Sequence, residues 1–123
     1  MKFQLEDHQY NNFISNYDSE SVVVSEKTYK GSLLISTTNI TQDWALKKIE
    51  DFTEKDCLFI ANQNSEIILL GSQSSIASID PRHRFWFANH GMGLEVMNIG
   101  AACRTYNILA AEGRSVLAAL IFP

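Results

Sequence analysis

The sequence has few of the residues that build metal and disulfide sites. It contains two cysteines, Cys57 and Cys103, and three histidines in 123 residues. The cysteines form no CxxC pair, and His8, His83 and His90 are dispersed, so no zinc signature is present. We therefore expect free thiols in a reducing compartment, no metal and no cofactor.

Long hydrophobic runs are also absent. The longest run, Val116 to Phe122, has seven residues, whereas a membrane-spanning helix needs about 20. The stretch Met1–Asp7 has no apolar core of the kind found in signal peptides. The sequence therefore predicts a cytoplasmic protein without a membrane-spanning segment.

Basic residues are scarce and scattered. Ten Lys and Arg stand against 14 Asp and Glu, which gives a net charge of -4. The densest basic group, Arg82–Arg84, is too short to contact many phosphates. We expect no nucleic-acid partner.

The length and the 46% hydrophobic content suit one globular domain over residues 1–123. We expect residues 1–12 to be flexible or loosely docked, since they are polar. The turn-like segments DSES and EKTYKG separate three predicted strands, which suggest an antiparallel meander: Phe13–Tyr17, Val22–Ser25 and Ser32–Ser36.

The middle of the chain alternates loops, helices and strands. Asn39–Gln42 is predicted as a loop, and Trp44–Lys48 fits a strand or a helix equally. Thr53 resembles an N-cap, and Pro81 suits the first position of a helix. The predicted elements are a helix over Thr53–Asn62, a strand covered on both faces over Glu66–Gly71, an extended piece over Ile76–Asp80, and a helix over Pro81–Asn89 that Gly91 ends.

The C-terminal segment has the pattern of a βαβ unit. The strand Leu94–Ile99 is followed by Gly100 as a break, then by a helix over Ala101–Glu112, Gly113 as its cap, and the strand Ser115–Phe122. Such a unit joins parallel strands through a right-handed crossover, and we expect these two strands to be neighbours in the sheet. The fold class is therefore α/β with a mixed sheet.

Ligands of open α/β sheets bind beside the carboxyl ends of the strands. Here that position leads into the 101–112 helix, where unpaired N–H groups favour an anion. A wheel of 100° per residue places Tyr106 toward the sheet and a strip of borderline residues beside it. The candidate cleft comprises Glu95, Gly100, Cys103, Arg104, Tyr106 and Asn107.

Each of these residues also has a structural interpretation, which we favour. Cys103 suits either a nucleophile or a small buried hydrophobic residue. Arg104 suits either an anion clamp or an ion pair with Glu95 or Glu112. We assign no catalytic residue.

The other polar residues of the cleft have structural roles available too. Tyr106 fits the core with its hydroxyl bonded at the rim, and Asn107 fits a tether between the helix and a loop. Glu95 interrupts an apolar strand, so we expect a buried carboxylate paired with Arg104 or Arg114, with general-base chemistry as the alternative.

Three consecutive aromatic residues, Phe85, Trp86 and Phe87, cannot all face one side of a helix. At least one should be partly exposed. The triplet is therefore either a protein-contact surface or a group that packs against the meander.

The segment "GLEVMNIGAACRTYNILAAEGRSVLAALIFP", preceded by "EIILLGS" and "SLLIS", resembles the domain-of-unknown-function 498 family, which includes mitochondrial complex I assembly factor 3. Glu95, Met97, Ala102–Asn107 and Glu112–Arg114 fit the family pattern. Ser72 and Gln73 replace a common glycine pair, and Asn98 and Ile99 replace a common Asp-Thr pair.

The resemblance implies a three-layer single domain with a central mixed sheet and no established catalysis. It also implies a protein partner and a polar cleft near Glu95, Arg104 and Asn107. We expect a non-enzymatic interaction or respiratory-complex assembly module, acting with a protein partner or as a homodimer. The alternatives are a small-molecule or anion-binding protein, or an unrecognised enzyme, with a thiol-dependent enzyme at Cys103 as one form.

Overall fold

A five-stranded mixed sheet forms the middle layer of the fold. The computed structural model describes residues 11–74 and 79–123. Within them the strand order is β5-β4-β8-β6-β7. The strands are β4 (Leu33–Ser36), β5 (Ile40–Thr41), β6 (Ile67–Ser72), β7 (Gly93–Asn98) and β8 (Val116–Leu120).

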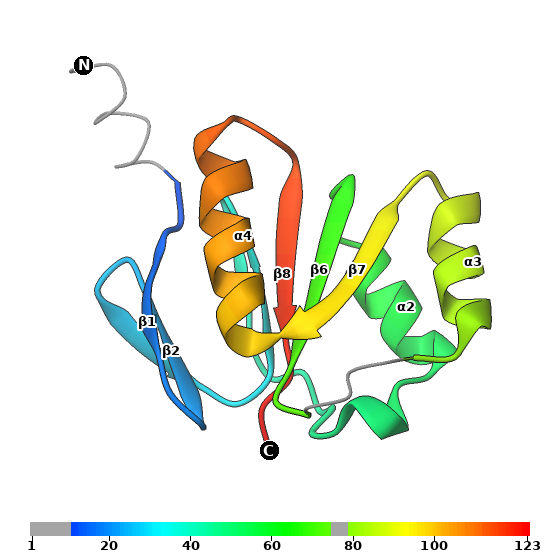
Figure 1. Cartoon of the computed structure of the whole chain (residues 1–123), viewed down its shortest axis with the longest axis horizontal. Coiled ribbons are helices and arrows are strands. Elements are labelled where there is room, and N and C mark those ends of the chain that lie inside the picture. The colour runs from blue at the N-terminus through cyan, green and yellow to red at the C-terminus, as the bar shows by residue number, and fades with distance from the viewer. Residues whose placement is uncertain (1–10, 75–78) are drawn as a thin grey trace.

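Helices cover both faces of this sheet, as Figure 1 shows. The helix α4 packs on one face together with a smaller antiparallel sheet, and α2 and α3 cover the other face. The helical elements are the 3-10 turn η1 (Ile49–Asp51), α2 (Glu54–Ala61), α3 (Pro81–Asn89) and α4 (Ile99–Ala111). The predicted three-layer α/β fold with a mixed sheet is confirmed.

The central strands β6 and β8 are buried on both faces, as the apolar run in each predicts. Leu69 of β6 belongs to the core under α4, whereas its neighbours Ile68 and Leu70 belong to the core under α2 and α3. Successive side chains of a strand point to opposite faces, so each central strand contributes to two cores.

The crossover through α4 joins strands that are not neighbours. The strand β6 lies between β7 and β8 and pairs in parallel with both. The expectation of two adjacent parallel strands joined by the helix is therefore wrong. Gly100 is also no break, because α4 begins at Ile99 and contains Gly100.

The N-terminal meander exists, but its third strand differs from the predicted one. The sheet consists of β1 (Ile14–Tyr17), β2 (Ser21–Val24) and β3 (Lys27–Lys30). The turn is confined to Ser25 and Glu26, whose φ angles are 48° and 74°. Lysines on the edge strand β3 gave its sequence the appearance of a turn, and they discourage further strand pairing.

The predicted third strand belongs to the central sheet, where β4 pairs antiparallel with β8. The expected loop at 39–42 contains the short strand β5, which pairs with β4. Residues 44–48 form neither of the two alternatives, and η1 follows them. Most of the extended piece expected at 76–80, and residues 1–10 of the flexible segment expected at 1–12, lie outside the described residues.

The predicted helix ends are confirmed within one or two residues. Thr53 precedes α2, and its backbone N–H donates to the Asp56 carboxylate at 2.8 Å. Pro81 is the first residue of α3. Gly91 and Gly113 follow α3 and α4 with φ angles of 75° and 79°, which favour glycine. Across residues 11–74 and 79–123, no helix has both the length and the apolar character that crossing a membrane requires.

The helix α4 approaches the sheet closely at Gly71 of β6. A Cβ atom there would lie 2.8 Å from Leu120 Cδ2 and 2.9 Å from Ala102 Cβ. We predict that Gly71→Ala lowers the free energy of unfolding by roughly 1–3 kcal/mol, because overpacking forces the helix and strand apart. Urea unfolding measures this change.

Gly93→Ala is the matched control, because the nearest atom to a Cβ at Gly93 is 3.9 Å away. We expect this second variant to be as stable as the wild type or slightly more stable. Equal stability of the two variants would show that the contact between α4 and β6 tolerates a methyl group.

Candidate functional site

The amino end of α4 lies against the small sheet instead of standing open to solvent. Asn98 caps the helix, and its side-chain oxygen accepts the Ala101 N–H at 2.8 Å. Gly100 is buried beneath the Tyr17 hydroxyl, and any Cβ at this position would overlap with that oxygen. A larger residue at this position would therefore displace the Tyr17 side chain, which is 42% exposed.

An open cavity of about 440 Å³ remains beside this helix end. It lies between the turn after β1 and the carboxyl ends of β6 and β7. Of the six predicted cleft residues, Gly100 alone is among its lining residues. The lining consists of Tyr17, Asp18, Ser19, Ser72, Gln73, Asn98, Ile99 and Gly100.

Tyr106 and Asn107 hold the N-terminal strand against α4. The Asn107 amide accepts the Ile14 N–H at 2.9 Å and donates to the Ile14 carbonyl at 2.7 Å. The Tyr106 hydroxyl donates to the Asn12 carbonyl at 2.8 Å, and burial raises the pKa of Tyr106. The structural interpretation of both residues is confirmed, with a strand as the tethered segment.

Cys103 is buried in the core under α4. Burial raises the pKa of its thiol to about 11, and the nearby Arg104 guanidinium offsets only part of that effect. Since the thiolate is the nucleophilic form, Cys103 is a poor nucleophile at neutral pH. The interpretation as a small buried hydrophobic residue describes this site.

Glu95 is not buried, although its apolar neighbours in the sequence predicted a buried carboxylate. It lies on the edge strand β7, and its side chain is exposed. Within the described residues, no ion pair joins Glu95 to Arg104 or Arg114, and Arg104 is not paired with Glu112 either. The prediction of a buried, paired carboxylate is wrong because α4 packs mainly on β6 and β8, and it leaves this position on the outermost strand uncovered.

A larger cavity, of about 630 Å³, lies on the opposite side of the central sheet. It is formed where η1 and the first turns of α2 and α3 meet. Its lining mixes apolar and charged side chains: Ile49, Glu50, Phe52, Thr53, Glu54, Ile79, Asp80, Arg82 and His83. We name it the η1–α2–α3 cavity.

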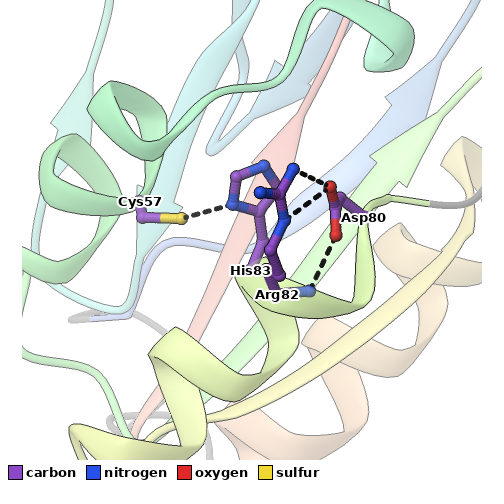
Figure 2. A network of polar contacts seen from close by, with 4 residues as sticks. All are labelled: Cys57, Asp80, Arg82 and His83. Atoms are coloured by element: carbon purple, nitrogen blue, oxygen red, sulfur yellow. Dashed lines mark hydrogen bonds and ion pairs between the residues drawn. The ribbon is translucent and has the colours of Figure 1, made fainter.

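A polar network adjoins the η1–α2–α3 cavity, and Figure 2 shows its four residues. The Asp80 carboxylate caps α3 by accepting the Arg82 N–H at 2.9 Å, and it also binds the Arg82 guanidinium, with the shortest distance 2.6 Å. These bonds hold the pKa of Asp80 at about 2. On the other side, Cys57 Sγ lies 3.7 Å from His83 Nδ1.

The Cys57–His83 pair has the residue types of a nucleophile and its base, but the thiol lacks the lowered pKa that a nucleophile needs. Cys57 is fully buried, and burial raises the pKa of its thiol to about 11, with further contributions from Asp56 and Glu54. A protonated thiol donates an S–H hydrogen bond to a bare Nδ1 or accepts one from Nδ1–H, according to the tautomer of His83. The pair therefore orients the imidazole and supplies no thiolate at neutral pH.

Sequence reasoning missed this pair because its members lie 26 residues apart, on different helices. The sequence does contain a signal for the Asp80 cap, because Asp-Pro before a helix is typical of an N-cap followed by the first helical residue. In the parts of the chain that the structure describes, no cluster of three His, Cys, Asp or Glu side chains could hold a metal ion.

The aromatic triplet divides between core and surface. Phe87 is buried in the core under α2 and α3, so its packing partner is the central sheet and not the meander. Trp86 stacks on His90 with 4.1 Å between ring centroids. Phe85 is 71% exposed, which confirms that at least one of the three reaches solvent.

The thiol environments lead to a prediction about reactivity. A pKa of about 11 in place of 9.0 lowers the thiolate fraction of Cys57 and Cys103 at neutral pH. We expect a disulfide reagent to react with each native thiol roughly 100-fold more slowly than with the urea-unfolded chain. Cys57→Ser and Cys103→Ser assign the two rates, and a fast native phase for either thiol would contradict the burial argument.

The Asp80–Arg82 contact leads to a prediction about pH. A carboxyl whose pKa is depressed in the folded state contributes stability above its ordinary pKa of 3.8, and this contribution is lost as the pH falls toward about 2. We expect Arg82→Gln to raise the pKa of Asp80 toward its ordinary value in a carbon-13 NMR titration. Arg84→Gln is the control, because Arg84 donates to the Leu94 carbonyl; an equal effect of both variants would refute the specific contact.

Comparison with known proteins places these features in a family. A family model described as "Protein of unknown function (DUF498/DUF598)" matches residues 14–121. The chain is similar to NADH dehydrogenase [ubiquinone] 1 alpha subcomplex assembly factor 3 from Xenopus tropicalis, with 28% identity over 113 residues. The same-named protein from Bos taurus is 27% identical. Each match covers 90% of this chain but 61% of the relative, so the chain spans about three-fifths of their length.

A solved structure has the same fold. The crystal structure of a Bordetella parapertussis protein superimposes with a TM-score of 0.81 and 26% sequence identity. The match covers 92% of this chain and 97% of that one. The arrangement of strands and helices described above is therefore shared along nearly the whole length of both chains.

Proposed function

We propose that this chain, which belongs to the DUF498/DUF598 family, is a non-enzymatic module that binds another protein during assembly of a respiratory complex. The similar proteins named as assembly factors support a protein partner. The buried thiols support the absence of thiol chemistry, because neither provides a thiolate at neutral pH.

The observation that carries the proposal is the exposure of Phe85. This side chain is 71% exposed on α3, while its neighbour Phe87 is fully buried and fixes the orientation of the helix. Aromatic side chains are enriched at the energetic centres of protein interfaces. Arg82, which lines the η1–α2–α3 cavity, lies three residues before Phe85, so these two side chains leave α3 from neighbouring positions on the helix surface.

A second candidate function is binding of a small molecule or anion at the start of α4. The cavity of about 440 Å³ beside Gly100 supports it, as does the position of Arg104, whose Nη1 would lie 3.2 Å from a Cβ at Gly100. Two features disfavour an anion. The Asp18 carboxylate lines the cavity, and Asn98 already occupies the Ala101 N–H.

Several expectations about context stay predictions. They are the single domain over residues 1–123, the cytoplasmic location, the homodimer as an alternative to a different partner, and the absence of nucleic-acid binding. The roles of Glu95, Cys103, Arg104, Tyr106 and Asn107 toward a ligand also stay predictions.

The interaction proposal is tested by replacing the exposed ring. The tagged chain is expressed in its own cells, and the proteins that it captures are collected. We expect Phe85→Ser to retain the fold and to lower capture of a respiratory-complex subunit about tenfold. Loss of an interface anchor costs about 1–2 kcal/mol or more. Quantitative mass spectrometry of the captured proteins measures the change.

Ile108→Ser is the matched control, because Ile108 is 60% exposed on α4, in the opposite layer. It should capture as much subunit as the wild type does. Absence of any captured subunit with the wild-type chain, or equal capture by the Phe85→Ser variant, would reject the proposal. Light scattering of the purified chain separates a homodimer from a different partner.

A further inference from the structure

The η1–α2–α3 cavity combines an apolar floor with a charged rim. Ile49, Phe52 and Ile79 are apolar members of its lining, and the Phe52 ring meets the His83 ring edge-on with 5.3 Å between centroids. Its volume of about 630 Å³ falls within the range of about 300–1,000 Å³ that is typical of ligand pockets.

The position of the cavity at two helix N-termini would ordinarily favour an anion. Here the protein's own carboxylates already occupy both ends. Asp56 accepts the Thr53 N–H at 2.8 Å at the start of α2, and Asp80 accepts the Arg82 N–H at 2.9 Å at the start of α3. An additional anion would therefore meet a carboxylate at each helix start.

The balance of charge in the lining is negative. The Arg82 guanidinium is held by Asp80 at 2.6 Å, so these two charges offset each other. Glu50 and Glu54 have no ion-pair partner within residues 11–74 and 79–123. Lys47 and Lys48, the lysines just before Glu50, line a separate, smaller cavity that shares Glu50.

The acids of this helix start also act on the neighbouring Cys57 thiol. The negative charges of Asp56 and Glu54 add to burial in raising the pKa of the Cys57 thiol. The field near the first turn of α2 therefore disfavours a further negative charge and favours a positive one.

We propose that the η1–α2–α3 cavity receives a basic side chain, lysine or arginine, from the protein partner. The aliphatic stem lies on Ile49, Phe52 and Ile79, and the charged head lies between Glu50 and Glu54. Long basic side chains bury their methylene groups on apolar surfaces while the charge stays at the rim. The inference rests on the proposed function in taking the partner to be a protein, and it adds the chemistry of the contact.

The test uses the whole chain and needs no identified partner. Nitrogen-15 NMR follows a titration with N-acetyl-arginine amide, and N-acetyl-citrulline amide serves as a neutral probe of nearly the same shape. We expect arginine-specific shifts that cluster at the backbone amides of the lining residues and weaken with added salt. Shifts that are absent, lie elsewhere or are equal for the two probes overturn the proposal.

Charge removal provides the second arm. The double variant Glu50→Gln with Glu54→Gln should bind the arginine probe roughly three- to tenfold more weakly, because two exposed ion pairs of modest strength are lost. Asp51→Asn is the matched control, because Asp51 is an exposed acid of η1 that is not among the lining residues. Unchanged affinity of the double variant, with its spectrum showing an intact fold, overturns the proposal.

The results of the arginine titration can be distinguished from those of the Phe85→Ser experiment. The titration contains no partner, so failure to capture a respiratory-complex subunit does not alter it. Conversely, loss of arginine binding in the titration overturns the cavity proposal and leaves the interaction function of α3 standing.

Discussion

The fold depends on the close contact of α4 with β6. Only at a glycine can the helix backbone approach the strand as it does at Gly71, where Ala102 fills the remaining space. This contact brings one side of α4 onto the central sheet and leaves its flank available for β1. The helix is consequently shared by two sheets, and the core under it contains residues of both.

The polar residues of α4 serve this arrangement. Asn107 takes the place of a neighbouring strand by exchanging two hydrogen bonds with the Ile14 backbone, and Tyr106 satisfies a further carbonyl. Buried polar groups need such partners, and a backbone segment at a sheet edge finds them here in side chains. The run of Cys, Arg, Thr, Tyr and Asn at the start of the helix thus belongs largely to the packing of the N-terminal sheet.

On the other side of the sheet, neighbouring helix ends create a different surface. The first turns of α2 and α3 meet beside η1, and each carries its own capping carboxylate. Phe87 and Trp86 fix α3, while Phe85 extends from the same helix into solvent. An exposed ring on α3 and an acidic cavity at the start of the same helix suit a protein that presents both apolar and basic groups.

The sequence by itself determined the α/β class, the helix limits at Thr53, Pro81, Gly91 and Gly113, and the burial of β6 and β8. These features follow from local rules, because caps, prolines, glycines and apolar runs act within a few residues. Tertiary structure decided the strand order, the assignment of β4 to the central sheet, the exposure of Glu95 and the meeting of Cys57 with His83. Those outcomes depend on which segments pair across the sheet. A local sequence pattern does not specify which distant segment will pack against it.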